Sequence, residues 1–320
     1  MFDFSCISPE LSLVSGVASR ILMSDKNFLT SDLAKFVLRN SKKLRSGIAL
    51  LGVLSTGEDV SEKIIRVCAL TEIIHNASLI HDDVVDNSSV RRGKLTLNKR
   101  FGVKSAVIAG DFLLSIVLNE LADLGMPEVT KSFAVSMSKM CKGEINQLFS
   151  TGKVPSVREY LKKSKNKTAL LFVSGMFAAL HAACSEKKSY FPIFNNNSSS
   201  KISEYEPCLL AFAENFGIAY QIYDDILNFA SSSEDKPVGS DFEAGIFTAP
   251  VIYFSLDFPD KSLQNLTCED ILKSDALAKS KALMDEYLHE ALENTSRLPD
   301  NRYKESLQNL CYDLIEMKIL

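Results

Sequence analysis

Two acidic clusters lie far apart in this sequence, each in an apolar segment. The first is Asp82-Asp83-Val84-Val85-Asp86 and the second is Asp224-Asp225. On a helix, Asp82 and Asp86 project from one face, one turn apart, whereas Asp83 points elsewhere. Mg²⁺ prefers oxygen ligands and commonly bridges one or two carboxylates to substrate phosphates. We therefore interpret the two clusters as parts of one magnesium site, at which the metal would also bind a substrate phosphate.

A single acidic cluster has a simpler interpretation, in which it marks a solvated helix end and forms surface ion pairs with Arg91 and Arg92. However, an unpaired carboxylate is expensive to bury, so acids within an apolar helix must reach water or meet a positive partner. Two clusters in equally apolar surroundings need a shared explanation. We therefore favour the metal site.

The composition is that of an ordinary soluble protein, with 46% hydrophobic and 24% charged residues in 320. The net charge is −4, and Lys and Arg are scattered along the chain, so nucleic acid is not an expected partner.

No apolar run reaches the roughly 18 residues of a spanning helix. Seven Cys without a CxxC pair or a Cys/His cluster indicate neither disulfides nor zinc. We expect an intracellular, soluble protein. Residues 1–5 show no clear transit peptide, and mitochondrial or plastid association stays open.

The elements that position the acids are expected to be helices. Apolar residues recur at intervals of three and four, for example over 33–37, 112–121 and 283–292, and long β-branched alternation is missing. This predicts an all-α fold with a single domain over residues 1–320. Small residues at 105–111 would let helix backbones approach closely. The polar segment at about 186–204 is predicted to be a mobile loop between helices.

Several segments together resemble the trans-isoprenyl diphosphate synthases, and most closely the long-chain (solanesyl and decaprenyl) type. The matching segments are Asp82–Asp86, Arg91–Gly93, Ala109–Leu114, Gly143–Leu148, Lys167–Ala169, Gln221 with Asp224–Asp225, and Lys236–Pro250. The resemblance implies a single bundle of roughly ten or more helices around a central cavity, the isoprenoid synthase fold. It also implies Mg²⁺ as cofactor, with roughly three ions once a diphosphate is bound.

The implied activity is head-to-tail condensation of isopentenyl diphosphate onto an allylic diphosphate, either farnesyl or geranylgeranyl diphosphate. Ionisation, condensation and elimination would give a long-chain all-trans polyprenyl diphosphate for a ubiquinone or plastoquinone side chain. The resemblance implies a homodimer and leaves a heteromer possible. A long apolar product suggests transient contact with a membrane surface.

The resemblance also implies roles for individual residues. Asp82, Asp86 and Asp224 would hold Mg²⁺, Arg91 would contact the allylic diphosphate, and Arg92 would contact isopentenyl diphosphate. Further positions match ligands of isopentenyl diphosphate (Lys42, Arg45, His75), residues lining the allylic site (Lys167, Thr168, Gln221) and a residue facing the metal-bound diphosphate (Lys236). By itself, Lys42 would be read as part of a solvated face, His75 as a core histidine, and Thr168 as a capping or back-bonded residue. Glu144 and Gln147 stay ambiguous.

Product length is predicted to depend on Ala77 and Ser78, about one turn before Asp82. If the growing chain runs down the bundle away from the metals, small side chains here leave room for it. In short-product members of the family that the chain resembles, an aromatic residue commonly fills this space. We expect Ala77→Phe to shorten the product.

Some positions depart from the family pattern and keep other functions open. Asn228 stands where a third acid of the second motif is usual, Ser41 and Ser46 replace a glycine and a proline, and Lys43 replaces an arginine. These changes leave two alternatives. One is a weakly active or non-catalytic subunit of a heteromeric synthase, and the other is a terpene cyclase.

Overall fold

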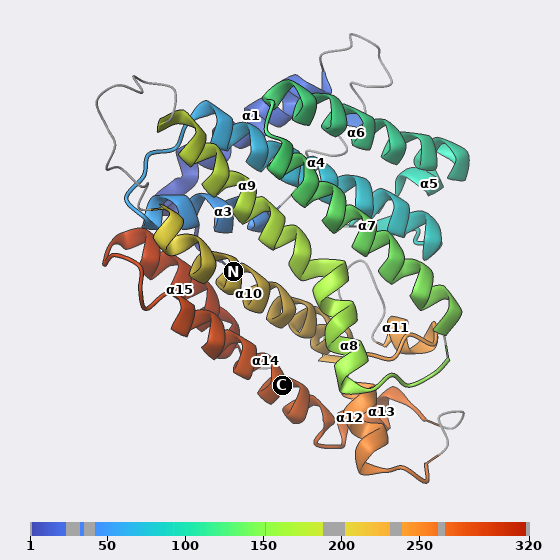
Figure 1. Ribbon diagram of the computed structural model, residues 1–320. Coiled ribbons are helices and arrows are strands. Elements are labelled where there is room, and N and C mark those ends of the chain that lie inside the picture. The colour runs from blue at the N-terminus through green and yellow to red at the C-terminus, as the bar shows by residue number, and fades with distance from the viewer. Residues whose placement is uncertain are drawn as a thin grey trace.

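The computed structural model describes residues 2–23, 33–34, 42–91, 93–150, 152–187, 202–230, 239–261 and 266–317. Within these ranges it is almost entirely helical, which confirms the all-α prediction (Figure 1). The only strands there are β1 (Val90–Arg91) and β2 (Lys94–Leu95), which pair antiparallel. The helical elements are η1 (Ser5–Ile7), α1 (Ser8–Leu22), α3 (Leu44–Ser55), α4 (Glu62–Val85), α5 (Leu97–Phe101), α6 (Val103–Leu124), α7 (Pro127–Ser150), α8 (Val157–Ser164), η2 (Lys165–Ala169), α9 (Leu170–Lys187), α10 (Ile202–Ala230), α11 (Ser240–Glu243), α12 (Ala249–Asp257), α13 (Cys268–Leu272), α14 (Ala276–Asn294) and α15 (Arg302–Ile315).

Helix α4 lies in the centre of the bundle. Its N-cap is Ser61, whose hydroxyl accepts a hydrogen bond from the N–H of Ile64. Buried side chains occur all around the helix from Ile64 to Ile80, and it packs against α1, α3, α6 and α9. A helix that is apolar on every side belongs in a core. The first acidic motif begins at the C-terminal end of this buried helix.

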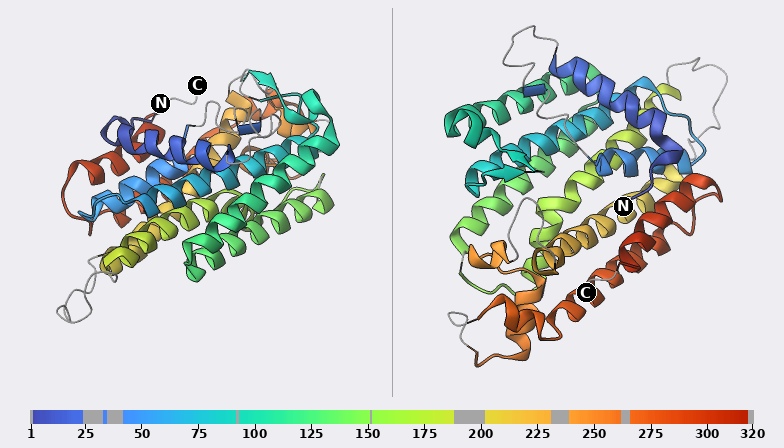
Figure 2. Two further views of the ribbon diagram at one scale, coloured as in Figure 1. Left: turned by 90° about the horizontal axis from the view of Figure 1, so that it is seen from above. Right: turned by 180° about the vertical axis from the view of Figure 1, so that it is seen from behind.

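The remaining helices surround this centre (Figures 1 and 2). Helices α6 and α7 lie on one side and α14 and α15 on the other, while α9 packs against α3, α4 and α10. One hydrophobic core joins residues from both sides of segment 188–201, such as Leu171 and Phe212. The expected close approach of small residues occurs at Gly110, where an added Cβ would lie 2.2 Å from the His81 ring. Glycine therefore allows α6 to pack closely on α4.

The segment predicted as a mobile loop is shorter than expected at both ends. Helix α9 continues to Lys187 and α10 begins at Ile202, so helical structure extends into the 186–204 range from either side. Residues 188–201 lie outside the described part of the chain.

Two helical stretches are long and apolar enough to cross a membrane, by length and composition alone. They are Val103–Leu124, of which 28% is buried inside the protein, and Val157–Ser185, of which 67% is buried. This differs from the expectation from sequence that no such stretch exists. The second stretch is largely a core segment, whereas the first, α6, exposes large apolar side chains such as Ile108 and Leu118.

Candidate active site

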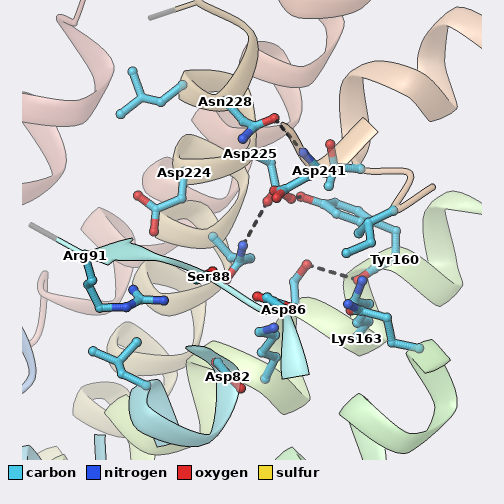
Figure 3. A pocket seen from close by; sticks show the side chains of 18 of the residues that line it. Asp82, Asp86, Ser88, Arg91, Tyr160, Lys163, Asp224, Asp225, Asn228 and Asp241 are labelled. Carbon is cyan, nitrogen blue, oxygen red and sulfur yellow. Dashed lines mark hydrogen bonds between the residues drawn. The ribbon is translucent and has the colours of Figure 1, made fainter. Parts of the chain in front are cut away.

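The acidic motifs meet in a cavity of about 390 Å³ (Figure 3). Asp82 and Asp86 of the first motif and Asp224 of the second motif all line it. In Figure 3, Asp82 and Asp86 lie on one side of the space and Asp224 and Asp225 on the other. The structure thus brings together carboxylates from the C-terminal end of α4 and from α10, as expected if the two acidic clusters form one site.

The first motif is held in place by hydrogen bonds that Asp83 accepts. Asp83 is only 2% exposed and points away from the cavity, as its spacing predicts, and its Oδ1 accepts a 2.7 Å hydrogen bond from Nε of Arg91. Its carbonyl oxygen accepts bonds from the N–H of Ser88 (2.9 Å) and from Nδ2 of Asn98 (3.0 Å). These bonds fix the turn after α4, so that Arg91 and Ser88 also line the cavity.

The two acids of the second motif have different surroundings. Asp224 is open to the cavity, whereas Asp225 is 5% exposed and has both carboxylate oxygens bonded. The hydroxyl of Tyr160 donates to Asp225 Oδ2 at 2.6 Å, and Nε2 of Gln221 donates to Oδ1 at 2.9 Å. Oε1 of Gln221 accepts in turn from the hydroxyl of Thr168. This chain of bonds ties α8, η2 and α10 together.

Enclosure by protein raises the pKa of the facing carboxylates. Burial raises the pKa of Asp82 to about 6, although Lys167 partly opposes the shift. Burial and the neighbouring Asp225 raise the pKa of Asp224 to about 7, with Lys42 and Arg45 opposing. Burial likewise raises the pKa of Asp225 to about 6. A raised pKa means that the charged form of the carboxylate is disfavoured. A cation bound between these carboxylates would stabilise that charged form.

Lysines from α8 and η2 supply positive charge to the cavity. Element η2 is a single π-helical turn, a feature that often marks functional sites, and it places Lys167 on the cavity wall. Nζ of Lys167 lies 2.6 Å from Oε1 of Glu144. Burial alone would lower the pKa of Lys167, but Asp82 and Glu144 outweigh it and raise the pKa. Lys163 also lines the cavity, and burial lowers its pKa.

Other predicted residues lie around or outside this cavity. Lys42 and Arg45 are near enough to Asp224 to affect its pKa, and the guanidinium of Arg45 lies 4.7 Å from the centre of the Phe172 ring. His75 is half-buried on α4 and Thr168 is buried in η2, and neither lines the cavity. Arg92, Lys236 and Ser41 lie outside the described residues.

The predicted length-determining residues do not line the cavity either. Ala77 is fully buried and Ser78 is half-buried on α4, and the cavity reaches this helix at Leu79.

Sequence reasoning missed several residues that line the cavity. Tyr160 and Lys163 lie on α8, before Lys167. In the sequence, Tyr160 has the pattern of a core residue, and Lys163 has that of a solvent-exposed residue in a basic run. Ser88 and Asp241 also face the cavity. Of the two ambiguous residues, Gln147 lines the cavity and Glu144 pairs with Lys167. The periodicity of α8 was the one signal that could have indicated Lys163, because it lies four residues before Lys167.

Two departures from the family pattern have structural consequences. The backbone carbonyl of Asn228 accepts the N–H of Gly239 at 2.7 Å, and its side-chain Oδ1 accepts the N–H of Asp241 at 3.4 Å. Asn228 therefore supports the segment that brings Asp241 to the cavity. Ser46 is fully buried, and its hydroxyl donates to Oε1 of the buried Glu72 at 2.9 Å.

The donor set suits a hard divalent cation that is shared with a substrate. The facing side chains are carboxylates, which Mg²⁺ prefers. In the described residues, however, no three His, Cys, Asp or Glu side chains are grouped closely enough to hold a metal ion by themselves. A metal here would therefore complete its coordination with water or with oxygens of a bound diphosphate.

Comparison with known proteins decides the family. The polyprenyl synthetase family model matches residues 27–286. The chain belongs to this family. This confirms the resemblance found in the motifs and identifies the protein as an enzyme, a trans-polyprenyl diphosphate synthase.

Individual relatives cover nearly the whole chain. A prenyl transferase of Cyanidium caldarium is 32% identical over 97% of this chain and 96% of its own. Component 2 of the heptaprenyl diphosphate synthase of Geobacillus stearothermophilus is 30% identical over 96% and 95%. A chloroplastic solanesyl-diphosphate synthase of rice, Oryza sativa, is 30% identical over 95% and 76%. The crystal structure of a heptaprenyl diphosphate synthase from Staphylococcus aureus, 27% identical, superimposes with a TM-score of 0.84 over 97% of this chain and 98% of its own. The isoprenoid synthase fold predicted from sequence is thereby confirmed.

Proposed function

We propose that this enzyme extends farnesyl or geranylgeranyl diphosphate with isopentenyl diphosphate to a long-chain all-trans polyprenyl diphosphate for a quinone side chain. One observation carries the proposal: Asp82, Asp86 and Asp224 line one cavity together with the cations Arg91, Lys163 and Lys167. A diphosphate leaving group develops negative charge, which must be stabilised. Carboxylates that share a divalent metal and cations that face the same cavity would provide this stabilisation. The relatives named as solanesyl and heptaprenyl synthases support a long product.

The reaction begins when the allylic C1–O bond breaks and leaves a carbocation and a diphosphate anion. Mg²⁺ bound to the aspartates would neutralise charge on that diphosphate. Lys167 and Arg91 face the cavity from two further elements and would add positive charge to the leaving group. Lys42 and Arg45 lie close enough to Asp224 to lower its pKa, and isopentenyl diphosphate bound by these two cations would be held beside the allylic substrate. A new C–C bond then forms, and the proton lost from isopentenyl diphosphate goes to the departed diphosphate.

We also propose that two copies of the chain associate through α6 and α7. Exposed apolar side chains gather on both helices: Ile108 is 67% and Leu118 52% exposed on α6, and Ile145 is 54% and Phe149 84% exposed on α7. Several large apolar side chains exposed on neighbouring helices usually mark a surface that contacts another protein. A heteromer, in which a different partner chain covers this face, is the second candidate. The relatives named as component 2 of a heptaprenyl synthase favour it.

Relatives named as chloroplastic support a plastid as one location of this protein.

Incubating the purified chain alone with Mg²⁺, farnesyl or geranylgeranyl diphosphate and labelled isopentenyl diphosphate tests these proposals. Long polyprenyl products, sized by chromatography, would support the proposed synthase. A cyclic hydrocarbon would indicate a terpene cyclase, and activity only after a partner chain is added would indicate a heteromeric subunit. Asp82→Asn is the control, because it removes a facing carboxylate and is expected to abolish product in each case.

A further inference from the structure

One stretch of the chain is strongly basic although the whole protein carries a net charge of −4. Residues 87–110 contain six Lys and Arg and no Asp or Glu. Two of the six are the arginines of the first motif. The other four, Lys94, Lys99, Arg100 and Lys104, are all exposed, and we call them the basic patch. Lys and Arg are otherwise scattered along the chain, and this segment is an exception.

The cations of the basic patch have no carboxylate partner in the part of the chain that the structure describes. Within the described residues none of the four forms an ion pair, whereas Lys261, Lys279 and Lys304 each pair with an acid. The guanidinium of Arg100 lies 4.8 Å from the centre of the neighbouring Phe101 ring. Charge left uncompensated in this way is available to an anionic partner.

Exposed apolar side chains lie between these cations. Leu95 is 58%, Phe101 45% and Val103 54% exposed. Leu95 follows Lys94 in β2, Phe101 ends α5, and Val103 begins α6 next to Lys104. Alternation of basic and large apolar side chains is typical of surfaces that bind the headgroup region of a membrane, where the cations meet lipid phosphates and the apolar groups enter the acyl boundary.

The patch lies directly beside the active-site cavity. Strand β1 contributes Val90 and Arg91 to the cavity wall, and its partner strand β2 carries Lys94 and Leu95 on the outside. Figure 1 shows α5 at the edge of the molecule, next to the start of α6. A surface bound here would lie close to the cavity.

We propose that the basic patch, with Leu95, Phe101 and Val103, docks the enzyme on an anionic lipid bilayer. The interface proposed above between two copies uses Ile108 and Leu118 of α6 together with α7, and not the basic patch. Placing the patch itself on a two-fold axis would bring like charges together. The proposal goes beyond the catalytic function, because binding to a bilayer needs no turnover.

Vesicle flotation of the full chain tests the proposal. We expect binding to phosphatidylcholine vesicles that contain one-third phosphatidylglycerol, much weaker binding to phosphatidylcholine alone, and release when salt rises from about 0.1 M to about 0.5 M. Each basic residue contributes about a fivefold factor on an anionic surface, so Lys99→Glu/Arg100→Glu should lower the partition coefficient at least about 25-fold. Phe101→Ser and Leu95→Ser should each weaken binding with the charges intact.

The matched control is Lys273→Glu/Arg297→Glu, which changes net charge equally at exposed positions outside the patch and should bind like the wild type. Equal binding of the Lys99→Glu/Arg100→Glu and wild-type chains, or no preference for anionic vesicles, would overturn the proposal. A change of oligomeric state in that variant by light scattering, without a change in vesicle binding, would assign the patch to a second copy instead. Turnover of a water-soluble allylic substrate should be unchanged in both double variants, so the vesicle result and the catalytic assay can fail independently.

Discussion

Tyr160 donates a 2.6 Å hydrogen bond to Asp225, whereas Asp224, the preceding residue, faces the cavity without such a bond among the described residues. The two acids of the second motif therefore differ in what they can do. Both oxygens of Asp225 already accept hydrogen bonds, from Tyr160 and from Gln221. Asp224 remains available for a cation, and Asp225 positions the elements around it.

This difference predicts separate effects for a substitution at Asp224 and for substitutions in the pair Asp225 and Tyr160. Asp224→Asn should lower kcat/KM by at least about 100-fold, because it removes charge that faces the diphosphate. Asp225→Asn and Tyr160→Phe should mainly lower the free energy of unfolding, by about 1–3 kcal/mol, because each leaves a buried polar group poorly bonded. Steady-state kinetics against Mg²⁺ concentration and urea unfolding separate the two effects. Equal losses of apparent Mg²⁺ affinity in Asp224→Asn and Asp225→Asn would contradict the division of roles.

The carboxylates of the cavity also predict how stability depends on pH. Burial raises the pKa of Asp82 and Asp225 to about 6 and that of Asp224 to about 7, from 3.8 in an unfolded chain. Between these values the folded state binds more protons than the unfolded state, so stability falls as pH rises from about 4 to about 7 and then levels off.

Thermal melting of the metal-free protein between pH 5 and 8 measures this effect. Asp224→Asn should show a shallower decline than the wild type, because one of the three groups no longer titrates. Saturating Mg²⁺ with inorganic diphosphate should raise the melting temperature more at pH 7.5 than at pH 5.5, because the cation binds the deprotonated carboxylates. A melting temperature that rises across this range in the metal-free protein, and does so equally in Asp224→Asn, would exclude this origin.

Close packing beneath the Lys167 turn gives a further prediction. A Cβ added at Gly217 on α10 would lie 2.6 Å from Cα and 2.9 Å from Cβ of Ala169, so the backbone of η2 would have to move. Gly217→Ala should therefore cost about 1–3 kcal/mol in the free energy of unfolding. It should also raise the KM for the allylic substrate, because η2 carries Lys167.

The control for this variant is Gly16→Ala on α1, where an added Cβ meets nothing within 4 Å. That change should stabilise the protein by about 0.5–1 kcal/mol, as Ala generally does in a helix. Unfolding by urea and kinetics with each substrate varied in turn compare the two variants. A Gly217→Ala protein as stable and as active as the wild type would show that η2 tolerates displacement.

The sequence was sufficient for the features that depend on local periodicity. Spacing within one helix predicted that Asp82 and Asp86 share a face and that Asp83 does not, because side-chain direction follows from helix geometry. The bond from Tyr160 to Asp225 could not be predicted in this way, since it joins residues 65 positions apart. Lys163 was missed because a lysine in a basic run has the same pattern whether it faces solvent or a cavity.

Ala77 provides the last prediction, on the length of the product. It is fully buried on α4, below the point where the cavity reaches Leu79, so a growing apolar chain must enter the packed core to pass it. A phenylalanine at this position would fill the path close to the metals. Ala77→Phe should therefore retain the first condensation and shift the products to shorter chains.

Overpacking by itself must be separated from this effect, because a larger side chain in a full core costs about 1–3 kcal/mol wherever it is placed. Ala291 on α14 is equally buried and lies outside the cavity wall. Ala291→Phe should lower stability without a change in product length. Chromatographic sizing of the products of both variants, under conditions where both are folded by circular dichroism, makes the comparison. If Ala77→Phe gives the same chain lengths as the wild type, the growing chain follows a path that does not pass Ala77.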